Sequence, residues 1–361
     1  MTMWELEELQ PPALLGFVRN LLPVPTYQGN SFLPPVTVDD VEFEYIKGFN
    51  DLPVMAHVIT WDAEAPMGRR QAQGEKVQGE LPPIKRKERI SEKEILRFLQ
   101  PRRGTADQQA AVREVYARTA RLVASIQARV EWLQLQALSE DKVIYNEGGI
   151  IISFDYGINP DQQIDLVTQL DGDATDVSAK YGPVWTDRAN SKPVSDLMVL
   201  CDEVEDRTGA RPARLVTSKT MAANLLFSAE IKGFTYPLNA PDRPLTPAEV
   251  SDTLNRYNLP SVSTYDVKVR AEAHDGTVTE VRTMAANKAF LLPGTNVGNT
   301  LVGPTAEARI LIGTPYQQLV SGIWANTYQK DEPPSEWVKA AATIFPSMPD
   351  AHLIAQMKLG A

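Results

Sequence analysis

One unbroken helical pattern, from Asp107 to Leu138, constrains this chain more than any other feature of its sequence. At 1.5 Å per residue such a helix is about 48 Å long, whereas most globular helices run about 8–20 residues. Apolar residues form one stripe along it, and arginines and glutamates occupy the other side. The stripe includes Val112, Val115, Val123, Ile126 and Val130. The helix therefore predicts either an ordinary domain with one long element or a building block that meets copies of itself.

The composition limits the class of protein. A length of 361 residues predicts two subdomains, and 43% hydrophobic residues are enough for a core. A formal charge of −10 argues against a protein that coats nucleic acid. The single Cys201 excludes an internal disulfide and fits a reducing cytoplasm. No signal peptide or run of about 20 apolar residues is present, so we expect an intracellular chain without a membrane partner.

Residues 1–54 have the character of an extended arm. A short helix is predicted from Pro12 to Leu22, and prolines then keep the chain extended. Spaced hydrophobic residues argue against the alternative, a disordered tail. We interpret the segment as an N-terminal arm that lies over another surface. Its predicted contact residues are Phe17, Phe32, Phe43 and Tyr45.

A second projection is predicted over residues 55–92. Met55–Trp61 is typical of a strand, and Ile84–Ile90 is the expected returning strand of a long hairpin arm. Between Met67 and Arg89, seven basic residues against three acidic ones give +4 and leave −14 elsewhere. Such an arm is complementary to the next copy's body. The alternatives are a solvated loop or a nucleic-acid contact, and no aromatic residues interleave the basic ones to favour the latter. The predicted contact residues are Trp61, Met67, Arg69, Arg70, Lys76, Lys85, Arg86, Lys87 and Arg89.

The rest of the chain predicts a mixed α+β fold. Trp132 projects from the polar side of the long helix and indicates a second packing partner there. Further expectations are a hinge at 101–104, a hairpin around 146–149, a helix from 194 to 208, helix starts at Ser218 and Thr246, and a hairpin at Asp275–Gly276. Strands at 336–344 and 352–357 are expected to return to the sheet that contains Ile150–Phe154.

No catalytic, cofactor-binding or metal-binding residues are predicted. The three histidines are isolated in sequence, and no phosphate-loop, dinucleotide or serine-hydrolase motif is present. Asp171, Asp173 and Asp176 lack the glycine and glutamate positions of a calcium loop. Cys201 lies on the apolar face of its helix, where it is a core residue. An enzyme with scattered catalytic residues stays open as an alternative.

The order of several motifs resembles the lambda-like phage major capsid protein E family, which has the HK97 shell fold. The resemblance spans about residues 30–350. Its motifs are Phe32-x4-Thr37-x3-Val41-Glu-Phe43-Glu, Leu52-Pro53, Ile144-Tyr145-Asn-Glu-Gly-Gly149, Ser153-Phe154-Asp155-Tyr-Gly157, Trp185 with Pro193-Val194-Ser195-Asp196-Leu197, and Tyr328 with Asp331-Glu-Pro333.

This resemblance implies a particular layout. It implies an N-terminal arm (1–54), an extended β-hairpin E-loop (55–92), a peripheral domain (93–189) with a spine helix (107–138), an axial domain (190–311) and a C-terminal return to the peripheral domain (312–361). The implied function is a major capsid protein that forms hexamers and pentamers of an icosahedral phage head around double-stranded DNA. An encapsulin-type compartment, a soluble enzyme and a phage tail or connector protein are the alternatives.

The resemblance also implies partners. Besides copies of itself, these are a separate scaffolding protein, a portal and a decoration or head-stabilising protein, with packaged DNA contacted weakly and without sequence preference. The scaffolding protein is expected to be separate because no long helical extension precedes the arm. The implied location is the virion, after assembly in the host cytoplasm.

Overall fold

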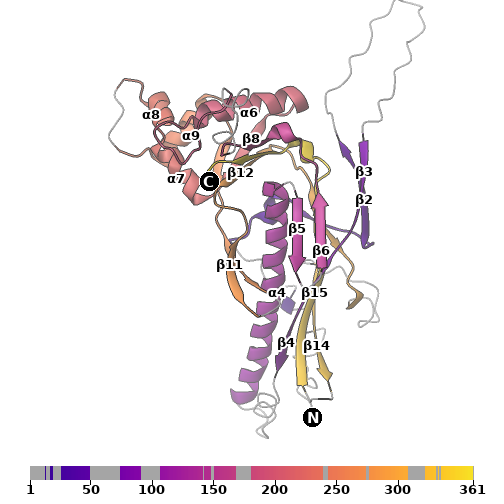
Figure 1. Ribbon diagram of the computed structural model, residues 1–361. Coiled ribbons are helices and arrows are strands. Elements are labelled where there is room, and N and C mark those ends of the chain that lie inside the picture. The colour runs from indigo at the N-terminus through magenta and orange to yellow at the C-terminus, as the bar shows by residue number, and fades with distance from the viewer. Residues whose placement is uncertain are drawn as a thin grey trace, which may run out of the picture. The chain divides into compact units, whose positions relative to one another are not determined.

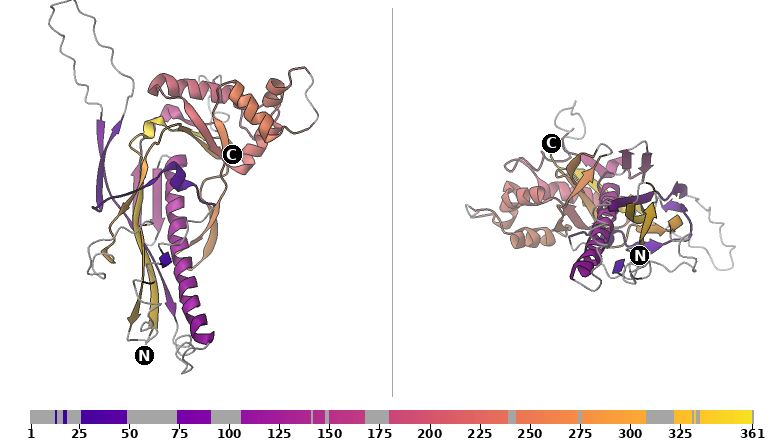
Figure 2. Two further views of the ribbon diagram at one scale, coloured as in Figure 1. Left: turned by 180° about the vertical axis from the view of Figure 1, so that it is seen from behind. Right: turned by 90° about the horizontal axis from the view of Figure 1, so that it is seen from below.

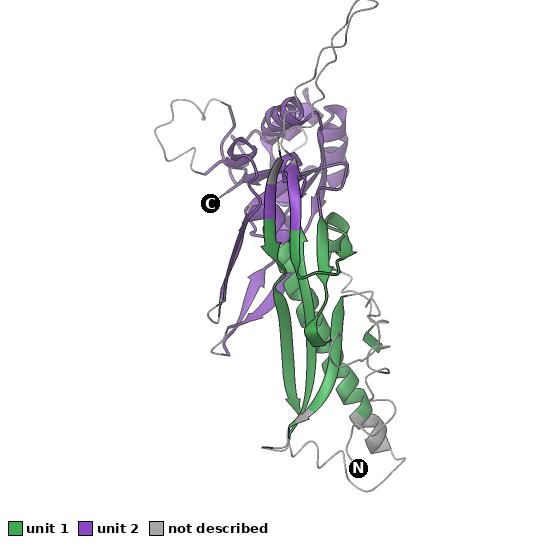
Figure 3. Cartoon of the chain, turned by 90° about the vertical axis from the view of Figure 1, so that its right-hand side faces the viewer, with its two compact units in different colours: residues 1–43, 78–134, 299–347 green, residues 44–77, 135–298, 348–361 purple. Residues whose placement is uncertain are grey.

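The computed structural model describes residues 13, 17–18, 26–48, 74–90, 106–140, 142–147, 150–167, 180–238, 243–273, 276–307, 322–330, 332 and 335–360. Helices and strands alternate irregularly along these residues (Figure 1), which confirms the predicted α+β class. The chain divides into two compact units (Figure 3). Unit 1 comprises residues 1–43, 78–134 and 299–347, and unit 2 comprises residues 44–77, 135–298 and 348–361.

Unit 1 is built on a five-stranded sheet around one long strand, β15 (Ser335–Ser347). Three strands pair antiparallel with it: β14 (Ile323–Lys330), β13 (Asn299–Gly303) and β4 (Pro83–Ile90). The short β1 (Pro35–Thr37) pairs parallel with β13. Pairings between strands so distant in sequence leave little local signal, which is why the sequence did not predict this sheet.

The long helix α4 (Ala106–Glu140) confirms the predicted helix almost to the residue. It runs beside β4, β14 and β15 (Figure 1). Its stripe packs on one face of the sheet, where Val115, Val123, Ile126 and Val130 are buried with β-strand residues such as Ile90 and Val338. Val112 lies partly buried at the edge of this cluster, and the Arg129 guanidinium lies 5.3 Å from the centre of the half-buried Trp132 ring.

Strands β2 (Glu42–Gly48) and β3 (Gly74–Glu80) form a two-stranded ribbon whose backbone pairs with neither larger sheet (Figure 1). The prediction that Ile84–Ile90 is one side of the projecting arm was wrong. That segment is β4, and it pairs with β15 from Pro83 to Ile90. Lys85, Arg86, Lys87 and Arg89 therefore belong to the sheet of unit 1. The physical reason is that Ile84 and Ile90 pack into the core under α4.

The remaining predicted arm residues divide into two groups. Lys76 lies on β3, where its Nζ is 2.7 Å from a carboxylate oxygen of Glu44 on β2. The predicted strand Met55–Trp61, Met67, Arg69 and Arg70 lie outside the described residues, as does the expected hinge at 101–104.

Unit 2 contains a second five-stranded sheet, ordered β7 (Gln163–Asp165), β16 (Ala355–Lys358), β12 (Lys288–Pro293), β8 (Pro212–Thr217) and β9 (Ser261–Thr264). The helices α6 (Pro193–Thr208), α7 (Lys219–Phe227), α8 (Ala229–Thr235) and α9 (Pro247–Arg256) share one apolar core with this sheet (Figure 2). Strand β12 is buried along most of its length, as expected for a strand covered on both faces.

The smaller predicted elements of unit 2 are confirmed. Gly209 ends α6 with a φ of 74°, the Ser218 hydroxyl caps α7, and Thr246 and Glu249 form a capping box on α9. The two predicted hairpins are β5 (Lys142–Glu147) with β6 (Ile150–Asp155), and β10 (Lys268–Glu272) with β11 (Val278–Arg282). Short helices complete the described residues: α2 (Gly29–Phe32), η3 (Pro160–Gln162) and η4 (Ala351–Leu353).

The predicted return of the C-terminal strands to the sheet of Ile150–Phe154 was wrong. That segment is β6, whose partner is β5. Strand β15 instead belongs to the sheet of unit 1, and β16 pairs with β12 and β7 in unit 2. An apolar pattern predicts that a strand is buried but not which strand pairs with it. The sequences of β15 and β16 were therefore compatible with either sheet.

Candidate assembly surfaces

The predicted N-terminal arm residues lie mostly against their own chain. Phe32 and Phe43 are buried, and Phe43 stacks on Phe345 of β15 with ring centres 5.9 Å apart. The Phe17 ring meets Tyr116 of α4 edge-on, with ring centres 4.6 Å apart. Tyr45 is half-buried, and burial raises its pKa to about 12. These four rings therefore anchor the arm on its own chain, and their contact with a neighbouring subunit stays a prediction.

The outer face of the β2–β3 ribbon presents one large apolar side chain to solvent. Ile46 is 71% exposed and follows the exposed Glu42 and Glu44 at alternate positions of β2. At the ribbon's base, the Leu81 N–H donates to the Val41 carbonyl at 2.8 Å. A single exposed isoleucine is ordinary on a protein surface, and here it is the one large apolar contact that this face of β2 offers.

The β5–β6 hairpin has a second exposed apolar pair. Ile144 is 61% exposed and Ile151 is 73% exposed, and both belong to the same face of the hairpin because Ile144 is opposite Ser153 and Ile151 is opposite Asn146. The opposite face carries the buried Val143. Burial of one face and exposure of two isoleucines on the other indicate a surface suited to contact with a second molecule.

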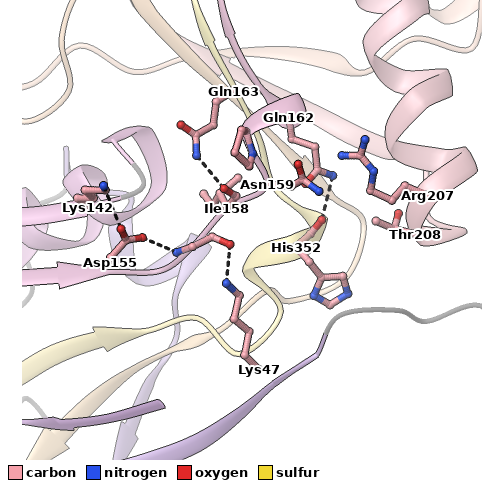
Figure 4. A pocket seen from close by; sticks show the side chains of 12 residues that line it. Lys47, Lys142, Asp155, Ile158, Asn159, Gln162, Gln163, Arg207, Thr208 and His352 are labelled. Atoms are coloured by element: carbon pink, nitrogen blue, oxygen red, sulfur yellow. Dashed lines mark hydrogen bonds and ion pairs between the residues drawn. The ribbon is translucent and has the colours of Figure 1, made fainter. Parts of the chain in front are cut away.

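A polar cavity of about 530 Å³ lies in unit 2 beside this hairpin (Figure 4). Lys142 Nζ is 3.0 Å from Asp155, the Lys47 ammonium donates to the Gly157 carbonyl at 2.5 Å, and the Gln162 amide donates to the His352 carbonyl at 3.0 Å. Burial would raise the pKa of Asp155, but Lys142 and the Gly157 N–H lower it below its usual value. These contacts join β5 to β6, β2 to Gly157 and η3 to η4, so the cavity's polar groups mainly hold its walls together.

A cationic and aromatic surface lies on the face of the unit 1 sheet opposite α4. Residues directly opposite each other in neighbouring strands share a face, and the register places three such rows there. The rows are Lys85–Ala341–Trp324, Lys87–Lys339–Asn326 and Arg89–Trp337–Tyr328. We call these nine residues, together with Glu307, the cationic sheet face. No local pattern predicts this face, because its aromatic residues come from strands about 240 residues away from β4.

Aromatic and charged groups are in direct contact on this face. The Tyr328 and Trp337 rings are stacked with centres 6.3 Å apart, and Lys87 Nζ lies 4.8 Å from the Trp337 ring centre. Glu307 Oε1 accepts hydrogen bonds from Lys339 at 2.5 Å and Lys85 at 2.7 Å. Burial would raise the pKa of Glu307, but these two lysines lower it to about 2. Glu307 is therefore ionised at neutral pH.

The described residues include no group of three or more metal-ligating side chains. Cys201 is buried in the core of unit 2, and burial raises the pKa of its thiol to about 12, which disfavours a nucleophilic thiolate. His57 and His274 lie outside the described residues. Among the described helices, none combines the length and apolar character needed to cross a bilayer.

Comparison with known proteins identifies the class. The fold is that of HK97-like capsid proteins. The chain belongs to the family of phage major capsid protein E, whose model matches residues 11–359. Its function is therefore that of a phage capsid protein, a structural component of the virion that self-assembles into a shell. No match was found among curated protein sequences.

Two solved structures are similar over nearly the whole chain. One is a protein assigned as the capsid protein of a prophage in E. coli CFT073, with 17% identity and a TM-score of 0.63, covering 98% of this chain and 99% of that one. The other is a phage-related protein from Bordetella bronchiseptica RB50, with 13% identity and a TM-score of 0.55, again covering 98% and 99%. At these identities the similarity concerns the fold alone.

Proposed function

We propose that this chain forms the hexamers and pentamers of an icosahedral phage head that encloses double-stranded DNA. The β2–β3 ribbon carries the proposal, because residues 49–73 join two strands that pair with each other and with neither large sheet. A ribbon with an exposed Ile46 gains its stabilisation when a neighbouring subunit covers it. Many such contacts per subunit strengthen one another through effective concentration.

The finer layout is part of the same proposal. Residues 1–41, in place of residues 1–54, act as the N-terminal arm, residues 93–189 with α4 as the peripheral domain, residues 190–311 as the axial domain, and residues 312–361 as the C-terminal return. We assign the E-loop to the β2–β3 ribbon and residues 49–73, in place of residues 55–92. A separate scaffolding protein, a portal and a decoration protein are the proposed partners, with assembly in the host cytoplasm.

The test is a deletion that leaves both ribbon strands in place. Residues 51–71 are replaced by a Gly-Ser linker of four residues, and the purified chain is examined by sedimentation and electron microscopy. We expect a folded, soluble subunit that forms no closed shells, whereas the unmodified chain forms them. The matched control shortens the loop between β10 and β11, which should leave shells intact. Normal particles from the 51–71 variant would refute the role of the ribbon.

The particle contents separate the two shell functions. A phage head and an encapsulin-type compartment share this architecture, but only the phage head is filled with genomic DNA. Nuclease-protected double-stranded DNA in particles made together with a portal and terminase supports the proposal. Particles that enclose a protein cargo and exclude DNA would favour the compartment.

A further inference from the structure

The outer face of the β2–β3 ribbon is acidic. Alternate residues of a strand share a face, and three successive alternate residues of β2 are exposed. The Lys76 ammonium of β3 pairs with the Glu44 carboxylate of β2, so the alternate residues of β3 that include Lys76 lie on the same side. Three carboxylates and one ammonium give this side a charge of −2. We call its exposed residues the acidic ribbon face: Glu42, Glu44, Ile46, Lys76, Gln78 and Glu80.

The cationic sheet face has the opposite charge. Its four cations and one carboxylate give it +3. Lys85 and Lys339 share the carboxylate of Glu307. Lys87 and Arg89 are exposed, and no carboxylate among the described residues forms an ion pair with either of them. These two cations are therefore the groups of this face best placed to meet an acidic partner.

The same face also presents an exposed aromatic pair. Tyr328 is 39% exposed, and its ring stacks on that of the half-buried Trp337. Arg89 lies in the same row of the sheet as these two residues. Tyrosine, tryptophan and arginine are the residues that most often dominate the binding energy of protein interfaces. The composition of the face therefore favours a protein partner with an apolar group next to its acidic groups.

The acidic ribbon face has the matching order of groups. Along β2 its groups are acidic, acidic and apolar, at Glu42, Glu44 and Ile46. The rows of the cationic sheet face begin with Lys85, Lys87 and Arg89, and only the third contains exposed aromatic rings. Successive groups are about 6.6 Å apart on both strands, because each step spans two residues. A ribbon laid along β4 therefore brings each acidic residue against a lysine and the isoleucine against the aromatic pair.

Other partners complement these two faces less well. The β5–β6 hairpin exposes two isoleucines, but its Lys142 and Asp155 pair with each other and leave no net charge for the ribbon. Duplex DNA would meet the cations of the sheet face, but it would leave the acidic ribbon face without a partner. Only a contact between the two faces satisfies both.

The two faces meet between copies of the chain. Both are exposed in a single chain, so they do not cover each other there. A contact between two different surfaces is heterologous, because each subunit gives its ribbon to one neighbour and its sheet face to the other. Heterologous contacts close into rings when the rotation between neighbours fits, and hexamers and pentamers are such rings.

We infer that the acidic ribbon face of one subunit docks on the cationic sheet face of the next subunit in the ring. Glu42 and Glu44 lie against Lys85 and Lys87, and Ile46 packs on the aromatic pair. The inference rests on the proposed function and supplies the surface of the second copy that receives the ribbon.

Charge reversal in the full chain tests the contact. One variant reverses the sheet face with Lys87→Glu and Arg89→Glu, and a second reverses the ribbon with Glu42→Lys and Glu44→Lys. Each variant alone puts like charges against each other, so we expect loss of closed shells by sedimentation and electron microscopy. All four changes in one chain restore opposite charges, so shells should return. Urea unfolding establishes first that each variant folds.

The matched control reverses two exposed cations at alternate positions of another strand. Lys268→Glu with Arg270→Glu in β10 makes the same change of charge and should leave assembly unchanged. Normal shells from both reversed variants would overturn the inference. Shells from the sheet-face variant that form normally but retain less DNA would assign this face to DNA instead.

A mixture of the two reversed variants shows whether the contact joins different chains. A six-membered ring can alternate the two variants, with opposite charges at every contact. A five-membered ring retains one contact between like charges, so hexamers should recover more fully than closed shells. A mixture that assembles no better than either variant alone would contradict a contact between subunits.

A second measurement needs no variant. Shells are assembled from mixed ¹⁴N and ¹⁵N chains and treated with a carbodiimide, which joins a carboxylate to a neighbouring amine as an amide. We expect amides between Glu42 or Glu44 of one chain and Lys85 or Lys87 of another, identified by mass spectrometry. Shells without such bonds, or with these bonds only inside one chain, would overturn the inference and leave the proposed function standing. Unmodified chains that form no shells would refute the proposed function and the inference with it, so the two failures are distinguished.

Discussion

The carboxylate of Glu131 accepts hydrogen bonds from the backbone N–H of Gly29, with both oxygens 3.0 Å from the nitrogen. The neighbouring Gln28 N–H donates to the same carboxylate at 3.0 Å. Glu131 is a buried residue of α4, and its partners lie more than 100 residues earlier, at the start of α2. The negative charge also lies at the N-terminus of that short helix, where it is favourable. The long helix therefore fixes the path of the N-terminal arm.

Replacement of this carboxylate should loosen the arm. Glu131→Gln keeps the size of the side chain but puts an NH2 group where an oxygen accepts from the backbone. We expect the free energy of unfolding to fall by about 1–3 kcal/mol, measured by urea denaturation at pH 7. Glu114→Gln is the matched control on the same helix, because Glu114 makes partly exposed ion pairs with Arg118 and Arg121. It should cost under about 1 kcal/mol, and equal costs would contradict a special role for Glu131.

The same contact leaves no space for a side chain at residue 29. A Cβ on Gly29 would lie 2.6 Å from Glu131 Oε2 and against Gln134. Gly29→Ala should therefore destabilise the chain by about 1–3 kcal/mol and increase proteolysis of the arm. Gly233→Ala in α8 is the control, because its Cβ would meet nothing within 4 Å. Alanine is also the better helix former, so this control should be neutral or stabilising by up to about 1 kcal/mol. A stable Gly29→Ala chain would show that the arm tolerates displacement.

The elements with a local signal could be predicted from the sequence. The helix α4 follows from a repeating apolar stripe, and the caps at Ser218 and Thr246 follow from side chains that bond their own backbone. The family resemblance was confirmed and supplied the shell fold and the function.

The partners of the strands could not be predicted in the same way. Ile84–Ile90 was assigned to a free arm because its basic residues are consecutive in sequence, yet β15 is its partner about 250 residues later. The same error hid the cationic sheet face. Its lysines were visible in the sequence, but Trp324, Tyr328 and Trp337 join them only through that pairing. The contact residues proposed on the arms stay predictions until a shell is examined.

The stability of unit 2 should depend on pH through Asp196. This residue of α6 is only 1% exposed, and burial raises the pKa of its carboxyl group to about 6. Hydrogen bonds from Gly182 N–H at 2.6 Å and Trp185 Nε1 at 2.9 Å lower this pKa, but by less than burial raises it. The unfolded chain has a pKa near 3.8 for this group. Between these values the folded state binds more protons, so the free energy of unfolding decreases as pH rises through about 6. In total, ionisation of Asp196 should lower the free energy of unfolding by about 3 kcal/mol.

The variant Asp196→Asn tests this dependence. Asparagine cannot ionise, so the difference in unfolding free energy between variant and unmodified chain should change between pH 4 and pH 7.5. Only the change of this difference with pH is diagnostic. Asparagine keeps one of the two acceptor oxygens, so the variant is less stable than the unmodified chain at every pH. A difference that stays constant across this range would show that Asp196 is not the titrating group.

The stability that Glu307 contributes should depend on pH in the opposite direction to that of Asp196. Its folded pKa of about 2 lies below the ordinary value of 4.5, so it contributes stability that is present above pH 4.5 and lost as pH falls through about 2. Glu307→Gln should cost about 2 kcal/mol at pH 7, because Lys85 and Lys339 lose their shared carboxylate. The cost should shrink in acid, as followed by unfolding at pH 7 and pH 2. Glu280→Gln, which removes a 3.8 Å exposed pair with Lys268, is the control and should have little effect at either pH.

The exposed isoleucines of the β5–β6 hairpin should matter for assembly and not for folding. Ile144 and Ile151 pack little in the isolated chain, so replacing both with aspartate should change the free energy of unfolding by under about 1 kcal/mol. In a shell, however, each aspartate would place a charge in a contact that excludes water, at a cost of several kcal/mol per contact. Sedimentation should therefore show subunits or small oligomers in place of shells. Asn146→Asp adds a charge to the same exposed face without removing an apolar group, and it should weaken assembly less. If the double variant assembles normally, the hairpin faces solvent in the shell and makes no contact that assembly needs.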